Sequence, residues 1–222
     1  MKNVIESKQL TKIYHSGNSQ FKALDNFSIA IPAGEFLMIT GKNGSGKSTL
    51  LHLLALLDKP DSGEIFIHNQ ETTCLPEKKR MDLRLEKLGY IFQEYALIGE
   101  LTALENVMLP AMMLYSNKEA RMKAIEILEK VNLKDKIARL PSELSGGEQQ
   151  RVAIARSLIN NPKIIFADEP TANLDTTASR GVLEIFKTLN EKEGITIVMV
   201  THEAEELVYA SRQIKLSDGR LA

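Results

Sequence analysis

The sequence has little of several features that mark particular classes of protein. Its 222 residues include one cysteine, Cys74, so no disulfide can form within the chain, and residues 1–6 lack the apolar run of a secretory signal. Both absences favour the cytoplasm. The longest apolar stretches, residues 53–57 and 195–200, fall far short of the roughly 20 apolar residues that a membrane-spanning helix needs. We therefore expect the chain not to cross a membrane by itself.

The sequence also lacks an excess of either basic or acidic residues. The 28 basic and 29 acidic residues give a net charge of −1, which argues against a nucleic-acid-binding surface. Hydrophobic and charged fractions of 43% and 26% are close to those of soluble globular proteins and exclude disorder and collagen-like structure. No repeat of 20 to 50 residues predicts a solenoid. His15, His52, His68 and Cys74 show no metal-ligand spacing, so we expect no transition-metal site.

The order of apolar runs and turns predicts an α/β fold. Short apolar runs at 36–40, 88–92, 163–167 and 195–200 are typical of buried strands. Candidate strands at 4–10, 27–31 and 64–67, with turns at 16–18 and 61–63, predict a separate antiparallel layer near the N-terminus. Residues 101–140 have a helical pattern, with Ser116 and Glu119 spaced as a capping box, and suggest an insertion between two strands. Asp175 can cap a helix that ends near Gly194.

The strongest motif is a phosphate-binding loop that follows an apolar strand and precedes the helical run 49–57. Its glycines let successive backbone N–H groups face a polyphosphate, and the helix adds its positive N-terminal end. Lys47 supplies a charge for the outer phosphates, and Ser48 supplies an oxygen for Mg²⁺. A chance match is expected in about one chain in a hundred. The predicted phosphate-binding residues are Gly41, Lys42, Asn43, Gly44, Ser45, Gly46, Lys47, Ser48 and Thr49.

Two carboxylates end the apolar run 164–167. Next to a phosphate loop, Asp168 can hold a metal or its waters, and Glu169 can orient or deprotonate the water that attacks the γ-phosphate. The alternative is a solvated strand end, which we would expect in about one case in four without a phosphate loop and which the loop disfavours further.

A third motif places small residues at the start of a helix, which is a second candidate anion site. Taken alone it is weaker, because Ser-Gly-Gly also caps ordinary helices. The residues concerned are Ser145, Gly146, Gly147 and Glu148, followed by Gln149.

Together, and in this order, the three motifs resemble the nucleotide-binding subunits of ATP-binding cassette (ABC) transporters over essentially the whole chain. The resemblance implies a P-loop NTPase with a mixed central sheet, an N-terminal antiparallel β layer and an inserted α-helical subdomain. It implies one ATP-binding domain over 1–222, with the helical subdomain at about 94–160 carrying the signature motif. Within the family, residues 101–107 and 167–175 resemble the corresponding segments of the lipoprotein-releasing and macrolide-export group. Lys42 and Glu203 are mild departures from the family pattern.

The family also implies roles for single residues. Tyr14 would stack on adenine, Gln93 would link the metal and the attacking water to a membrane partner, and His202 would contact the γ-phosphate. Glu169, His202 and Gln93 would then be catalytic, with Mg²⁺ held by Ser48, Gln93 and Asp168. Without the family, Tyr14 as core packing and His202 as an ordinary strand-end histidine are the stronger interpretations.

The same resemblance implies partners. ATP would be held between the phosphate loop of one copy and Ser145 to Glu148 of a second copy, in a homodimer. Separate permease subunits would dock on the helical subdomain, where Met108, Met112 and Met113 offer adaptable side chains, although core filling explains them as well. The mixed-charge stretch 77–87 favours a solvated helical face. The chain would then lie in the cytoplasm, peripheral on the inner face of the membrane.

Three functions remain open from the sequence. The first is the ATPase subunit of a membrane exporter or extractor. The second is a regulatory ATPase that transmits force through a membrane partner without moving a solute. The third is a soluble scaffold or DNA-maintenance ATPase, which the absence of long coiled-coil or zinc insertions disfavours.

Overall fold

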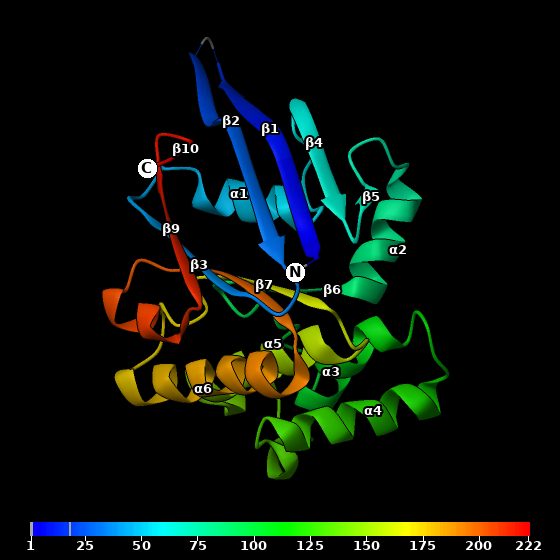
Figure 1. Ribbon diagram of the computed structural model, residues 1–222. Helices are drawn as coiled ribbons and strands as arrows, with labels where there is room; N and C mark the ends of the chain where they lie inside the picture. Colours follow the sequence, from blue (N-terminus) through cyan, green and yellow to red (C-terminus); the bar gives the residue numbers. More distant parts are fainter. Residues whose placement is uncertain (1, 18) are drawn as a thin grey trace.

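The structure is a computed structural model that describes residues 2–17 and 19–222, so Asn18 of the turn expected at 16–18 lies outside the described residues. It contains two sheets with helices between and below them (Figure 1). This arrangement confirms the predicted α/β class with an antiparallel layer and a mixed sheet.

The antiparallel sheet has the order β2-β1-β4-β5. Its strands are β1 (Asn3–Ser16), β2 (Ser19–Pro32), β4 (Ser62–Ile67) and β5 (Gln70–Glu71). β1 and β2 are much longer than the apolar pattern predicts, because their polar outer halves are held by backbone pairing and not by burial. Register shifts between Ser7 and Ile13 bend this long ribbon, and Gln9 and Asn26 have positive φ there.

The second sheet has the order β10-β9-β3-β8-β7-β6. Strands β6, β7, β8, β3 and β9 run parallel, and β10 pairs antiparallel with β9, so the sheet is mixed. The bounds are β3 (Phe36–Gly41), β6 (Leu88–Ile91), β7 (Ile164–Asp168), β8 (Thr196–Val200), β9 (Arg212–Ser217) and β10 (Arg220–Leu221). The four predicted buried strands agree with this sheet to within one residue at each end.

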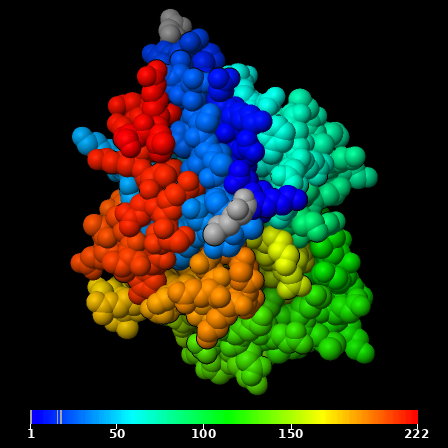
Figure 2. All heavy atoms as spheres, viewed as in Figure 1, coloured from blue at the N-terminus to red at the C-terminus, as the bar shows by residue number. Residues whose placement is uncertain are grey.

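Alternate residues of the central strands pack against different layers. In β3, Leu37 and Ile39 face the core shared with the antiparallel sheet and α1 (Lys47–Leu54), whereas Phe36 and Met38 face the helices on the other side. Burial on both faces explains why these strands are continuously apolar. The helices on that other face include α5 (Gly146–Leu158) and α6 (Thr176–Glu193). Figure 2 shows the antiparallel ribbon and the green and orange helical segments at opposite ends of the molecule.

Between β6 and β7 the chain is helical. It forms α3 (Ala103–Ala111), α4 (Asn117–Lys130), the 3-10 turns η1 (Lys134–Lys136) and η2 (Pro141–Glu143), and then α5. The Ser116–Glu119 capping box is confirmed, and Thr102–Glu105 and Ser145–Glu148 form two more. Asp175 caps α6, which ends at Gly194 in the left-handed conformation, as predicted.

The stretch 77–87 is the helix α2 (Glu77–Lys87), and its charged face is largely exposed, as expected, with Arg80 as the exception. Arg80 is only 4% exposed, and its Nη2 donates to the carbonyl oxygens of Leu56 at 2.9 Å and Asp58 at 2.6 Å. The guanidinium therefore satisfies carbonyls just beyond the end of α1 and fixes the segment that follows the phosphate loop helix. A short 3-10 helix, η3 (Ala204–Tyr209), follows β8. None of the helices in the described ranges is both long and apolar enough to cross a bilayer.

Candidate nucleotide site

The predicted site residues follow the carboxyl ends of parallel strands. β3 leads into the phosphate loop, β6 into Gln93, β7 ends at Asp168, and β8 leads into His202. Because these strands run parallel, their carboxyl ends meet at one edge of the sheet, where open α/β folds bind ligands. Segments far apart in the sequence thus lie together at this edge (Figure 1).

The phosphate loop is a glycine-dependent structure. Gly46 has φ +101°, and a Cβ there would lie 2.2 Å from the carbonyl oxygen of Ala23. Lys47 is buried, and its Nζ donates to the carbonyl oxygens of Gly41 at 3.0 Å and Lys42 at 3.2 Å. The ammonium therefore lies folded under the loop, where it can also reach an anion that the loop holds.

A cavity of about 290 Å³ opens over this loop. Within the part of the chain that the structure describes, the buried Ser45 hydroxyl has no hydrogen-bond partner. Glycines, hydroxyls and one ammonium are groups that bind phosphate oxygens. The lining residues are Phe21, Asn43, Gly44, Gly46, Lys47, Ser48, Thr49 and Glu169.

The β7 carboxylates reach the loop and the end of β8. Ser48 Oγ donates to Asp168 Oδ1 at 3.1 Å. Burial raises the pKa of the Asp168 carboxyl, the Ser48 hydrogen bond opposes that shift, and the neighbouring Glu169 carboxylate adds to it. A cation beside Asp168 would favour its charged form. Glu169 Oε2 lies 3.2 Å from His202 Nδ1, so Glu169 and His202, 33 positions apart, form one pair.

Glu169 is also in an unusual backbone conformation. Its φ is +44°, in the left-handed region that non-glycine residues rarely adopt. Backbone hydrogen bonds hold this turn, from Glu169 N to Val200 O at 3.1 Å and from Ala172 N to Glu169 O at 3.2 Å. Such strain at a strand end next to a phosphate loop is typical of a functional position.

Gln93 and Tyr14, the remaining predicted residues, make no direct hydrogen bond to the Ser48–Asp168 pair among the described residues. Gln93 is exposed, and its carbonyl oxygen accepts from Asn173 Nδ2 at 3.4 Å; between the described residues, no hydrogen bond joins its side chain to Ser48 or Asp168. Tyr14 is 40% exposed, and its hydroxyl donates to Asp58 Oδ2 at 3.2 Å. Burial raises the pKa of Tyr14, and Asp58 adds to the rise. The exposure of Tyr14 disagrees with the core-packing interpretation.

Phe21 is a further residue at this site, and its sequence context did not predict it. This residue pairs with Tyr14 across β1 and β2, is 55% exposed and lines the cavity over the phosphate loop. It lies in a polar stretch, and an exposed phenylalanine with polar neighbours is the signal that would have indicated it.

The third motif lies outside that cavity. Ser145 caps α5, and Glu148 Oε2 accepts from the Ser145 N–H at 2.8 Å and hydroxyl at 2.9 Å. The hydrogen bond from the Ser145 N–H is the largest cause that lowers the pKa of Glu148, and the bond from the Ser145 hydroxyl adds to it. Gly147 lies against α6, where a Cβ would come within 2.9 Å of Ala178 Cβ. Residues 145–148 do not line the phosphate-loop cavity of their own chain.

This fold and site define a P-loop nucleotide-binding protein of the α/β class. Comparison with known proteins narrows the class. A family model described as ABC transporter matches residues 24–172. An ABC transporter ATP-binding protein of Methanocaldococcus jannaschii is 52% identical over 219 residues, which cover 98% of this chain and 97% of that protein. The lipoprotein-releasing system ATP-binding protein LolD of Aquifex aeolicus is 44% identical over 222 residues, covering 100% of this chain and 97% of LolD.

Among solved structures, an ATP-binding cassette seen as a dimer in a post-hydrolysis state with ADP and Pi matches with a TM-score of 0.91. It is 43% identical, and the match covers 98% of this chain and 96% of that one. The chain belongs to the ABC transporter family, and it is an ATP-binding and ATP-hydrolysing member of it. Relatives named for lipoprotein release and for macrolide export confirm the predicted subgroup.

Proposed function

We propose that this chain is the ATPase subunit of a membrane transporter, in which two copies close around ATP. The observation that carries this proposal is the separation of the two halves of the site. The phosphate loop, Asp168, Glu169 and His202 share one edge of the sheet, whereas Ser145 to Glu148 lie outside their cavity. A second copy supplies the missing helix start, as the dimeric assembly of the similar cassette supports. The relatives named as transporter subunits favour this function over force transmission alone.

Each predicted residue then has a role toward ATP. The loop residues 41–49 bind the phosphates, and Tyr14, with Phe21 beside it, packs against the base. Glu169 orients and deprotonates water, and His202 stabilises charge on the γ-phosphate. Hydrolysis permits the dimer to reopen.

A magnesium ion fits the donors present. Ser48 and Asp168 offer hard oxygen ligands that already lie 3.1 Å apart, and Mg²⁺ prefers one or two protein oxygens together with phosphate and water. We propose that Ser48 and Asp168 would hold the ion, with Gln93 as a further ligand. The ion would neutralise phosphate charge.

Mixing two inactive variants tests the shared site. Lys47→Ala removes the phosphate-binding ammonium, and Ser145→Asp keeps a helix cap while placing a negative charge against the partner's nucleotide. We expect each variant alone to be inactive. In an equal mixture, half of the dimers pair the two variants and keep one intact site of two, so ATPase activity should recover to about a quarter of the wild-type rate. No recovery on mixing would show that the site is not shared.

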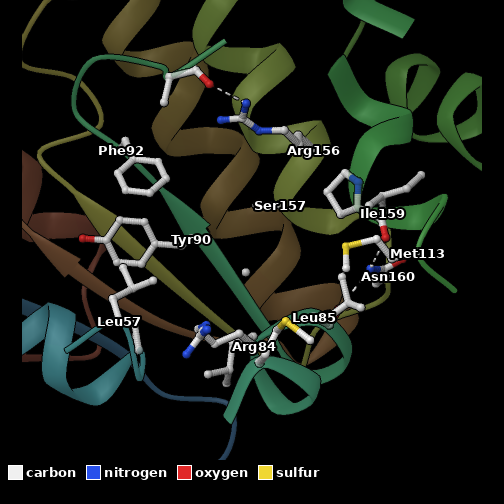
Figure 3. A pocket seen from close by; sticks show the side chains of 16 residues that line it. Leu57, Arg84, Leu85, Tyr90, Phe92, Met113, Arg156, Ser157, Ile159 and Asn160 are labelled. Atoms are coloured by element: carbon white, nitrogen blue, oxygen red, sulfur yellow. Dashed lines mark hydrogen bonds between the residues drawn. The ribbon is translucent and has the colours of Figure 1, made fainter. Parts of the chain in front are cut away.

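A second surface fits a permease partner. A groove of about 370 Å³ lies between α2, β6, α3 and α5, and Figure 3 shows Tyr90 and Phe92 on one side of it and Met113 and Asn160 on the other. Its lining is mainly apolar, and its two charged residues, Arg84 and Arg156, are both basic. Hydrogen bonds to backbone carbonyl oxygens hold both arginines in place. Arg84 Nη1 donates to Leu56 O at 2.8 Å, and Arg156 Nη2 donates to Tyr95 O at 2.8 Å.

The methionines expected at the partner face divide between core and surface. Met108 is 8% exposed and fills the core, whereas Met112 and Met113 are 48% and 62% exposed. Of these three methionines, only Met113 lines the groove. We propose that a short apolar helix of the permease binds there, which would hold the chain peripherally at the membrane.

Cell fractionation tests this docking surface. Met113→Glu places a charge in the groove, and we expect it to lower the membrane-bound fraction of the protein about tenfold while ATPase activity of the isolated chain is unchanged. Met122→Glu is the matched control, because Met122 is 56% exposed on α4 and does not line the groove. Equal membrane binding by the two variants would exclude the groove as the dock.

A further inference from the structure

One buried carboxylate has no role in the proposed site. Glu206, in η3, is 5% exposed although it carries an ionisable group. A carboxylate is rarely this buried unless its oxygens are hydrogen-bonded. Both oxygens of Glu206 are bonded, each to a different buried threonine.

The two threonines belong to the two segments that carry the catalytic candidates. Thr171 Oγ1 donates to Glu206 Oε1 at 2.5 Å, and Thr201 Oγ1 donates to Glu206 Oε2 at 2.6 Å. Thr171 lies two residues after Glu169, inside the turn closed by the hydrogen bond from Ala172 N to Glu169 O. Thr201 immediately precedes His202.

The network continues on both sides of His202. Thr201 Oγ1 also accepts from the Glu203 N–H at 3.0 Å, and Glu206 N donates to Glu203 O at 3.3 Å. The backbone before and after His202 is therefore tied to the same carboxylate that holds the turn after Glu169. Hydrogen bonds to a charged acceptor in a buried site are about twice as strong as neutral ones.

We propose that Glu206 is a positioning residue that holds the turn after Glu169 and the segment of His202 in one fixed relation, so that the Glu169–His202 pair keeps its catalytic geometry. It acts through Thr171 and Thr201 and does not touch the nucleotide. This inference rests on the proposed roles of Glu169 and His202.

The same tie has a consequence for the dimer. Thr171 immediately precedes residues 172–175, which look like the loop that touches the opposite subunit in the family, and Leu174 N donates to Thr171 O at 3.0 Å. A shift of this loop on dimer closure would be passed through Glu206 to the His202 segment. Glu206 would then couple closure to assembly of the catalytic pair.

Thr171→Val and Thr201→Val are the decisive variants, because each removes one hydroxyl and keeps the side-chain shape. Misplacing a catalytic group by a fraction of an ångström lowers turnover more than binding, so we expect kcat to fall about tenfold while KM for ATP changes less than about twofold. Thr171→Ser keeps a hydroxyl and should restore most of the rate.

Thr72→Val is the matched control. Thr72 is fully buried, and its hydroxyl makes a 2.9 Å hydrogen bond to Ile65 O in the antiparallel layer, remote from Glu206. It should lose as much thermal stability as the other two valine variants and keep its kcat. If Thr171→Val and Thr201→Val also lower the thermal midpoint but leave kcat at the Thr72→Val level, Glu206 is only structural and the proposal is wrong.

Failure of the proposed function gives a different result. If wild-type protein hydrolyses ATP but Glu169→Gln and His202→Ala do as well, the catalytic assignment fails before Glu206 is tested. If those two variants are inactive and the threonine variants match Thr72→Val, only the Glu206 proposal fails. A raised KM with unchanged kcat in the threonine variants would also overturn it, because that places the network in nucleotide binding.

Discussion

Replacing Glu169 by glutamine should separate ATP binding from ATP hydrolysis. The side chain is 16% exposed and contacts His202 Nδ1 through Oε2 at 3.2 Å. Glutamine has the same shape and can keep that contact, so the fold and the phosphate loop should be unaffected. What it loses is the negative charge and the ability to accept a proton from water.

The expected loss in rate follows from the proposed role of Glu169 as the general base. General base catalysis contributes about 10² to 10⁴ in rate, which corresponds to about 2.7 to 5.4 kcal/mol of barrier at 1.36 kcal/mol for each factor of ten. We expect kcat of Glu169→Gln to fall within this range. The measurement is steady-state phosphate release with ATP and Mg²⁺ in excess.

Whereas kcat should fall, binding of ATP by Glu169→Gln should become tighter. Two unit charges separated by one water molecule, about 6 Å, repel by about 3 kcal/mol at an effective dielectric constant of about 20. Removing the Glu169 charge therefore relieves up to about this much repulsion against the γ-phosphate. The variant should sediment as a dimer with ATP and as a monomer without it.

Glu203→Gln is the control for any general effect on His202. Glu203 Oε1 also contacts the ring, at 3.0 Å from Nε2, but its side chain is 58% exposed and does not line the phosphate-loop cavity. Its kcat should stay within about threefold of wild type, since exposed charge pairs contribute little. A Glu169→Gln protein that hydrolyses ATP at the Glu203→Gln rate, or stays monomeric with ATP, would refute the assignment.

Two further predictions concern the loop and the helix caps. Gly46→Ala places a Cβ 2.2 Å from Ala23 O at φ +101°, so it should lower the free energy of unfolding by at least about 2 kcal/mol in urea titrations and abolish nucleotide binding; a stable variant that binds ATP would contradict this. Hydrogen bonds within three capping boxes hold the glutamate pKa below its usual 4.5, so their stabilisation is fully present above about pH 4.5 and is lost as the pH falls through the lowered values. The urea midpoint of wild type should therefore fall between pH 5 and pH 3 more steeply than that of the triple glutamine variant, which keeps the caps without titrating, and equal slopes would contradict the argument. The three residues are Glu105, Glu119 and Glu148.

The parts of the fold that the sequence predicted well are those in which burial dictates composition. A central parallel strand is covered on both faces, so the strands at 36–40 and 195–200 are continuously apolar and easy to recognise. β9 was not predicted, because it carries Arg212, Gln213 and Lys215 near the edge of the sheet, where one face remains exposed. The outer halves of β1 and β2 were missed for the same reason.

The residues of the candidate site likewise fall into those that the sequence predicted and those that it did not. Backbone-driven motifs such as the phosphate loop depend on glycines at fixed spacing, and the sequence displays them directly. Phe21 and Glu206 carry no such signature. The proposed role of Phe21 depends on its pairing with β1, which sets it over the loop, and that of Glu206 on the position of η3 between two distant threonines. Tertiary contacts of this kind leave no local pattern.

The strain at Glu169 explains why a buried carboxylate would be retained nearby. A glutamate in the left-handed region costs about 1 to 3 kcal/mol, and such a conformation persists only when surrounding contacts hold it. One holding contact comes from β8, through Val200 O, and another from the turn at Ala172, which contains Thr171. Glu206 ties that turn to the residue after Val200. The strained Glu169 and its partner His202 are thus both held by contacts to β8 and to the turn at Ala172, so loss of either threonine hydroxyl should relax the geometry of both.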